Sequence, residues 1–181
     1  MKKALLLLLS FLLISNICFA NYEYKTFRNS LANMDAPSHW VQYNPGIVGN
    51  SRVLIDLKSP DGKASALVKR EEALYPYNNF NEMSERALNL LLLNEYSIMQ
   101  QKYPSAELLD YKFYNEWDNN KHVFYIMEVT FPTGKYRYFV DMFINHRHLT
   151  TIVVMTHLFL LNNLDIPRMI DSVGIKPPYI P

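Results

Sequence analysis

The sequence predicts an α+β fold in which an antiparallel β-sheet packs against a long central helix and a short C-terminal helix. Segments rich in β-branched and aromatic residues, interrupted by turn-like tetrapeptides, predict a three-stranded meander over His122–Phe131, Tyr136–Ile144 and Leu149–Thr156. A helical repeat of apolar residues predicts the long helix over Asn79–Tyr103. Alternating apolar residues on both sides of the Ser59-Pro60-Asp61-Gly62 turn predict a hairpin before that helix.

The first twenty residues predict a signal peptide. Met1–Lys3 is basic, Ala4–Ile14 is apolar, and Cys18-Phe19-Ala20 ends in a small residue that signal peptidase accepts. The apolar run is too short for a convincing membrane anchor. The residues before Cys18 also lack the small side chains of a lipoprotein signal. We therefore expect cleavage after Ala20 and a periplasmic or secreted protein.

The mature chain is expected to form a single domain over residues 21–176, followed by a proline-rich tail over 177–181. The whole chain has 18 basic and 17 acidic residues, and Lys2 and Lys3 leave with the signal, so the mature net charge is about −1. This balance gives no indication of nucleic acid or of an anionic membrane surface as a partner. The one cysteine leaves as well, so no disulfide is expected. No later stretch is long and apolar enough for a stable membrane span.

One short extended piece is expected before the hairpin. Pro37 disfavours helix at Ala36, so Trp40 is expected to begin an extended piece that caps one end of the core. Arg52–Lys58 and Lys63–Arg70 then alternate apolar and polar residues, which predicts the two strands of the hairpin.

The long helix is expected to begin with a capping box at Asn79-Phe80-Asn81-Glu82 and to end before Pro104. Glu107–Trp117 predicts a further strand, which extends the meander to four. A short helix is expected to start at Asp165-Ile166-Pro167 and to end at Gly174. The apolar stripe of the long helix is formed by Met83, Ala87, Leu90, Leu91 and Ile98, and is widened by Leu88, Leu92 and Met99.

The register of the meander follows if its turns close between Phe131 and Tyr136 and between Ile144 and Leu149. Side chains alternate with period two, so one face is then almost wholly apolar, and we expect the long helix to cover it. That face holds Val123, Tyr125, Met127, Val129, Phe131, Tyr136, Tyr138, Val140, Met142, Ile144, Leu149, Thr151, Val153 and Met155. The opposite face is mixed, with His122, Phe124, Ile126, Glu128, Arg137, Phe139, Asp141, Phe143, Thr150, Ile152 and Val154.

The order of hairpin, long helix, meander and terminal helix resembles the PsbP-like fold, which the extrinsic subunit of photosystem II shares with a nuclear Ran-binding protein. Pro37-Ser38-His39-Trp40 looks like the P-x-x-W entry of that group. Ser59-Pro60-Asp61-Gly62 between short strands and the closing Asp165–Val173 helix also fit. The resemblance implies a domain that binds or assists other macromolecules and usually catalyses nothing.

The sequence lacks the motifs of the common enzyme classes. It has no G-x-S-x-G elbow, no H-E-x-x-H, no phosphate-cradling glycine loop and no cysteine after the signal. With only 5 Gly in the chain, a glycine-built site is not expected, and we predict no cofactor. These observations favour a non-catalytic binding or assembly accessory whose partner is another envelope or secreted protein. A small-ligand or metal-binding carrier is the alternative, and a hydrolytic enzyme is a third class.

Three charged residues on the mixed face form a candidate ligand site. In the expected register Glu128 lies opposite Phe139, with Arg137 and Asp141 diagonal to it. One interpretation is an ion-pair cluster on a partly solvated sheet. The other is a site in which Arg137 clamps a carboxylate or phosphate between Phe139 and Phe143.

Three histidines form a candidate metal site. The same register places His122 opposite Asn145, at the sheet end that also carries His146 and His148. Three imidazoles around one turn could hold Zn²⁺ or Cu²⁺. Because no carboxylate in the turn would orient the rings, we expect weak binding at most.

Overall fold

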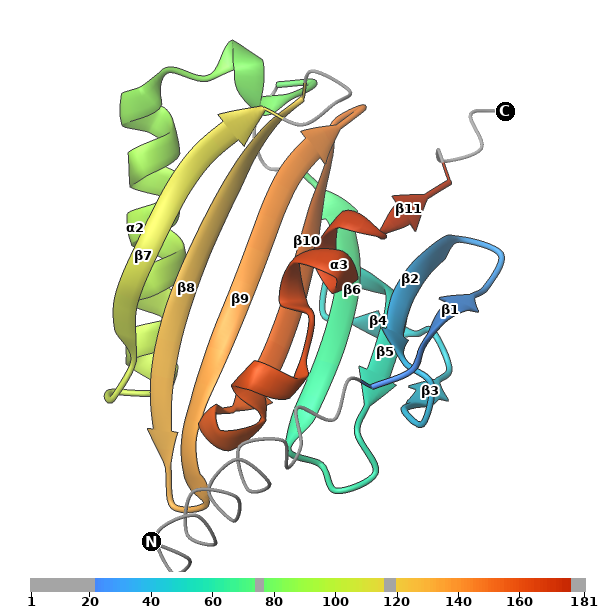
Figure 1. The fold of residues 1–181 in the computed structure, drawn as a ribbon. Helices are drawn as coiled ribbons and strands as arrows, with labels where there is room; N and C mark the ends of the chain where they lie inside the picture. The colour runs from blue at the N-terminus through green and yellow to red at the C-terminus, as the bar shows by residue number, and fades with distance from the viewer. Residues whose placement is uncertain (1–21, 74–76, 116–119, 177–181) are drawn as a thin grey trace, which may run out of the picture.

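The computed structural model describes residues 22–73, 77–115 and 120–176, and their strands form two antiparallel sheets (Figure 1). The predicted signal peptide, the 177–181 tail and part of the turn after Asn115 lie outside the described residues. The smaller sheet has the order β1-β2-β11, from β1 (Tyr24–Arg28), β2 (Ala32–Pro37) and β11 (Gly174–Ile175).

The larger sheet has eight strands in the order β3-β5-β6-β10-β9-β8-β7, with β4 also paired to β5. One long helix, α2 (Glu85–Lys102), and a short one, α3 (Ile166–Asp171), complete the α+β fold, which confirms the predicted class. Two 3-10 helices, η1 (Phe80–Glu82) and η2 (Leu158–Asn163), join the elements. The strands are β3 (Val41–Tyr43), β4 (Ile47–Val48), β5 (Ser51–Lys58), β6 (Ala64–Glu72), β7 (Glu107–Asn115), β8 (Lys121–Phe131), β9 (Gly134–Asn145) and β10 (His148–His157).

The meander is present, and one of its two expected turns is tighter in the structure. Leu149 pairs with Ile144 as expected, across the turn formed by His146 and Arg147. Phe131, however, pairs with Gly134 rather than with Tyr136, so the expected β8–β9 register was wrong by two residues. Gly134 has a φ of 127°, which only glycine adopts readily, and this allows the two-residue turn. An even shift leaves every side chain on its expected face.

Helix α2 begins later than the sequence suggested. Ser84 is its N-cap, and the Ser84 hydroxyl accepts a hydrogen bond from the backbone N–H of Ala87 at 3.2 Å. The expected cap was wrong: the Asn79 side chain makes no capping hydrogen bond and precedes the separate turn η1. Glu82 does reach back, but it accepts from the backbone N–H of Asn78.

Helix α2 covers the apolar face of the meander, as predicted. Leu88, Leu91 and Leu92 pack with the β8 and β9 side chains of that face, among them Tyr125 and Met142. The expected stripe was too wide, however, because two of its residues point to solvent. These are Leu90 and Ile98, which are 59% and 50% exposed.

A second core lies on the mixed face, which the sequence did not reveal. Phe139, Ile152 and Val154 are buried there against the β1-β2-β11 sheet and α3. Figure 1 shows α3 lying in front of β10 and β6, with β11 beyond β6 beside β2. Trp40, which directly precedes β3, is buried in the same core, as expected of a residue that caps it. Both faces of the larger sheet are therefore covered over part of their area.

Two long-range pairings tie the chain together. Strand β6 of the hairpin pairs with β10 of the meander, which makes one continuous sheet, and α2 carries the chain across to the far edge at β7. The last helix starts at Asp165 as expected and is capped at Ser172, before Gly174. Gly174 instead begins β11, which pairs with β2 at Asn33.

In the described part of the chain, no helix is long and apolar enough to cross a membrane.

Candidate functional site

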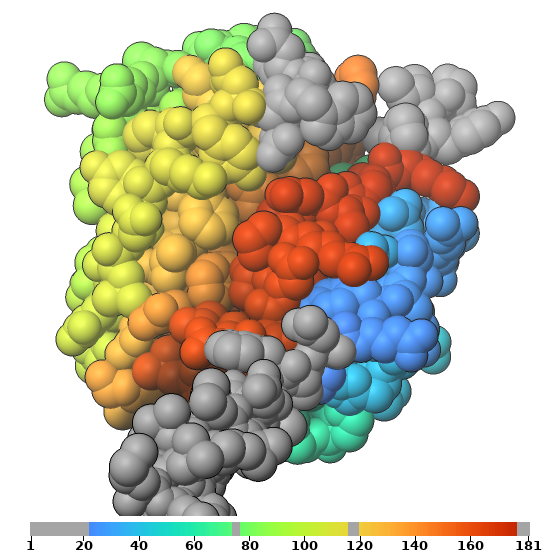
Figure 2. All heavy atoms as spheres, viewed as in Figure 1, coloured from blue at the N-terminus to red at the C-terminus, as the bar shows by residue number. Residues whose placement is uncertain are grey.

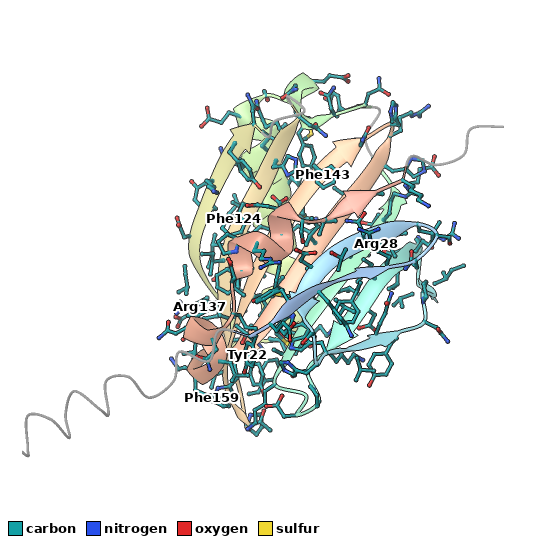
Figure 3. The ribbon with its side chains drawn as sticks, turned by 45° about the vertical axis from the view of Figure 1, so that its right-hand side comes forward. Tyr22, Arg28, Phe124, Arg137, Phe143 and Phe159 are labelled. Carbon is teal, nitrogen blue, oxygen red and sulfur yellow. The ribbon has the colours of Figure 1, made fainter. Side chains whose placement is uncertain are left out.

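The predicted site residues lie on the mixed face of the larger sheet, part of which is uncovered. Figure 2 shows α3 and η2 (red) and β1 and β2 (blue) covering the centre and right of this side, whereas β7 and β8 (yellow to orange) stay open at the left. Figure 3 shows that Phe143, Phe124 and Arg137 lie at different heights along this face. The site residues therefore separate into two groups along the strands.

The first group is an ion-pair cluster around Glu128. Glu128 pairs directly with Arg137 across β8 and β9 and accepts hydrogen bonds from Arg137 Nη2 at 3.1 Å and from Lys135 Nζ at 2.9 Å. The hydrogen bonds from Lys135 and Arg137 hold the pKa of the Glu128 carboxyl below its usual range. The expected contact between Glu128 and Arg137 is therefore present, although they are direct rather than diagonal partners.

Arg137 has one donor that the cluster leaves unused. Its Nε is buried and has no hydrogen-bond partner among the described residues, whereas its Nη2 binds Glu128. A buried donor without an acceptor costs about 1–3 kcal/mol, so such an atom calls for a bound water or ligand group. This atom is the feature of the face that most directly suggests a ligand.

Asp141 belongs to a second group, away from Glu128 and Arg137. It pairs across the strands with Phe124, and one carboxylate oxygen lies 2.7 Å from His122 Nδ1. The other oxygen accepts a hydrogen bond from the Tyr114 hydroxyl at 3.1 Å. Asp141 is four residues from Arg137 along β9, roughly 13 Å at 3.3 Å per residue. The structure thus does not bring Asp141 into the predicted three-residue cluster.

The His122–Asp141 pair is buried. Asp141 is 1% and His122 6% exposed, and the imidazole stacks on Phe143 with ring centroids 4.6 Å apart. Such a pair fixes the orientation of the ring, because Nδ1 is committed to the carboxylate and Nε2 is the nitrogen that faces other groups. The arrangement orients the imidazole, and it satisfies a carboxylate that would otherwise be costly to bury.

The two phenylalanines of the predicted clamp have other roles. Phe139 is buried in the core beneath α3, and Phe143 stacks on His122. Neither therefore forms the expected wall beside Arg137. A cation does lie against aromatic rings elsewhere on this face: the ammonium of Lys112 is 4.5 Å from the centroid of the Tyr114 ring and 5.2 Å from that of the Phe124 ring.

The three predicted metal ligands do not assemble. His122 is engaged with Asp141, whereas His146 and His148 belong to the β9–β10 turn, where His148 Nδ1 lies 2.9 Å from the His146 carbonyl oxygen. Across residues 22–73, 77–115 and 120–176, no group of three or more His, Cys, Asp and Glu side chains could hold a metal ion. The two-residue register shift explains this difference, because it places His122 level with Phe143 rather than with Asn145.

Sequence reasoning missed the partners of His122 and a pair of arginines. Asp141 and His122 were both placed on the mixed face, so a correct register would have brought them together. Arg52 and Arg70, from the two hairpin strands, lie directly opposite each other. Both residues stand in segments that the sequence predicted as paired strands, so the closing turn could have indicated their contact.

The comparisons with known proteins bear on the fold. No family model matches the sequence, and no curated protein matches it. The structure is similar to the solution structure of cyanobacterial PsbP from Synechocystis sp. PCC 6803, with a TM-score of 0.64 and 10% identity over 89% of this chain and 96% of that one. A crystal structure from Bacteroides thetaiotaomicron VPI-5482 gives a TM-score of 0.43 and 9% identity over 87% of this chain and 49% of that one. The PsbP structure confirms the predicted PsbP-like resemblance, as a likeness of fold alone.

Proposed function

We propose that this chain is an exported, non-catalytic accessory protein that binds another envelope or secreted protein. The PsbP-like fold is consistent with such a role. Because one fold can host many functions, however, we infer the role from the surface of the molecule. The surface feature that carries the proposal is a group of exposed apolar side chains on α2 and on the neighbouring edge strand β7. We call this group the α2–β7 surface: Leu90, Leu93, Leu109 and Tyr111.

The α2–β7 surface has the features of a protein-binding site. Strand β7 ends the sheet order, so one of its backbone edges has no neighbouring strand in the described structure. Helix α2 runs beside it, because Leu88 and Leu92 pack with Leu108 and Phe113 of β7 (Figure 1). Exposed apolar groups on adjacent elements mark interaction surfaces more often than isolated ones do. A β-bulge after Leu108 limits open-ended strand pairing, which favours one specific partner.

Site-specific photo-crosslinking tests this surface. A photoreactive amino acid at Leu93 or Tyr111 is expected to yield one discrete adduct in intact cells. The same amino acid at Thr133, in the exposed β8–β9 turn, is the matched control and is expected to yield none. Leu93→Lys should remove the adduct formed from Tyr111, because the charge would be buried in the interface. Equal labelling at all three positions would contradict the assignment.

Export is tested separately. The basic start and the short apolar run support cleavage after Ala20, so N-terminal sequencing of the mature protein should begin at Asn21. A retained Met1, or a diacylglycerol group on Cys18, would contradict this part of the proposal.

A small-ligand carrier is a second candidate, supported by the unused donor of Arg137. A ligand carboxylate or phosphate that accepts from Arg137 Nε would satisfy that buried atom. Calorimetric titration with acetate and with inorganic phosphate should give a saturable signal that Arg137→Gln abolishes. Lys135→Gln, which removes a neighbouring charge but not the donor, is the control. An absent signal, or one that both variants reduce equally, would contradict a specific site.

A further inference from the structure

The β4–β5 hairpin presents two aliphatic side chains to solvent. Ile47 is 80% and Val48 69% exposed, the highest values among the large apolar residues of the described chain. Val48 pairs with Ser51, so the turn holds only Gly49 and Asn50, and Gly49 has the positive φ of 59° that such a tight turn needs. We call Ile47 and Val48, which directly precede this turn, the hairpin tip. Because both side chains are mostly exposed, their burial contributes little to folding stability.

Cationic side chains stand directly behind this tip. Ile47 pairs with Arg52 across the hairpin, and Arg52 pairs in turn with Arg70 on β6. Like charges placed opposite each other destabilise a sheet. Burial and the charge of Arg52 lower the pKa of Arg70.

These two arginines have no acidic partner within 4 Å among the residues that the structure describes. Arg70 donates instead to the backbone carbonyl of Lys176, the residue that follows β11. The nearest acidic side chain on the other face of β6, Glu71, is occupied by the Ser51 hydroxyl and Lys69. Glu72, on the same face as Arg70, leaves the group with a net positive charge. An arrangement of cations that repel each other is stabilised by an anionic ligand.

We propose that this tip docks the protein on an anionic lipid surface, with Ile47 and Val48 inserted at the headgroup boundary and Arg52 and Arg70 on the lipid phosphates. Aliphatic residues that project from a narrow hairpin, with cations set one strand behind them, match the layered polarity of a membrane surface. A protein partner would need roughly 800 Å² of complementary surface on each side, and a two-residue tip offers much less. A lipid surface needs only a shallow insertion.

The proposed docking tip is independent of the α2–β7 surface. Strands β3 and β4 flank β5 at one edge of the larger sheet, and β7 forms the opposite edge (Figure 1). A protein that rests on lipid by one edge therefore leaves the other edge free for a partner. The near-neutral charge of the whole chain gave no sign of this, because the cations are concentrated locally.

Vesicle co-sedimentation of the mature protein tests the proposal. The probes are vesicles of phosphatidylcholine alone and of phosphatidylcholine mixed with phosphatidylglycerol, at low and at high NaCl. The protein is expected to bind the anionic vesicles, and to release as salt rises, because screening weakens the arginine–phosphate attraction. Ile47→Ser/Val48→Ser should lower the partition coefficient roughly tenfold or more. Arg52→Gln should lower it about fivefold, the effect of one basic residue near an anionic surface.

Matched variants distinguish docking through the hairpin tip from non-specific hydrophobic adsorption. Leu90→Ser/Leu93→Ser removes the same number of exposed aliphatic residues from α2 and should leave partitioning unchanged. Val48→Trp enlarges the apolar tip and should strengthen binding, so the proposal does not depend on a loss alone. Unfolding curves identify any variant that is misfolded.

Four results would overturn the proposal. The first is no sedimentation with anionic vesicles, and the second is equal binding to neutral and anionic vesicles. The third is a loss of binding that the Leu90/Leu93 control shares. The fourth is sensitivity to Arg52→Gln with none to the tip variants, which would assign the arginines to an acidic soluble partner instead.

Discussion

Truncation of three consecutive leucines in α2 measures how the helix packs on the sheet. Leu92 is 2% exposed, Leu91 lines a hollow of about 60 Å³ beside β10, and Leu90 points to solvent. Leu→Ala removes three carbon atoms, a transfer loss of roughly 2.4 kcal/mol at about 0.8 kcal/mol each when the site is fully buried. A residual cavity adds to this at Leu92, for a total of about 3–4 kcal/mol. At Leu91 the existing hollow lets the surroundings relax, so about 2–3 kcal/mol is expected.

Leu90→Ala is the internal control, with an expected change of at most about 0.5 kcal/mol, since alanine is also the best helix former. Urea unfolding at an unchanged m-value gives the three free energies, and the melting temperature of Leu92→Ala should fall by roughly 6–16 °C. The expected order is Leu92, then Leu91, then Leu90. A Leu90→Ala loss equal to that of Leu92→Ala would show that the helix is rotated, and the described α2 packing would be wrong.

Three further predictions concern buried charge and backbone conformation. Asp141→Asn should lower the free energy of unfolding by about 2–4 kcal/mol, because it removes the charged partner of the buried His122. Gly134→Ala should cost about 1–3 kcal/mol, since its φ is 127° and a Cβ would lie 2.2 Å from His157 Nε2. Burial raises the pKa of Glu95, so Glu95→Gln should stabilise the protein at pH 7. That gain should vanish as the pH falls below about 4.3, where the carboxyl is protonated in the folded and unfolded states alike.

Each of these has a matched control in the chain. Asp110→Asn removes an exposed carboxylate and should change stability little, so a similar loss at both positions would argue against the buried pair. Gly46→Ala meets no atom within 4 Å and lacks a positive φ, so it should be neutral or slightly stabilising. For Glu95, urea unfolding repeated across the pH range decides, and a Glu95→Gln effect that does not change with pH would exclude desolvation as its cause.

Much of the fold follows from local periodicity. The meander, the hairpin and α2 each show their own alternation or helical repeat, which depends only on neighbours in sequence. Strands β1 and β2 were missed because β1 buries only Phe27 and exposes Lys25, Thr26 and Arg28, which hides the alternation, and because β2 gains its second neighbour only from Gly174–Ile175 at the other end of the chain. Pairing between strands so far apart in the sequence produces no local sequence pattern.

At the candidate site, an error in the length of one turn changed several predicted side-chain contacts. The turn after Phe131 was expected to hold four residues, but Gly134 allows a turn of two. Every side chain lies on its expected face, because the register shift is even. The predicted Glu128–Arg137 contact is also present, because diagonal and direct partners both lie within reach of long side chains. Asp141 contacts His122 instead, and this contact, which was not predicted, depends on the register alone.

The pairing of β6 with β10 also orders the events of folding. The hairpin and the meander join strands that follow each other along the chain, so both can form early from nearby segments. The seam between them pairs Leu67 with Val153, and all of α2, β7, β8 and β9 lies between these residues in sequence. The entropy of closing so long a loop is lost before the contacts of the seam are gained. The closing of this seam is therefore expected to be the slow step, and until it closes the chain exposes the inner edges of two half-sheets.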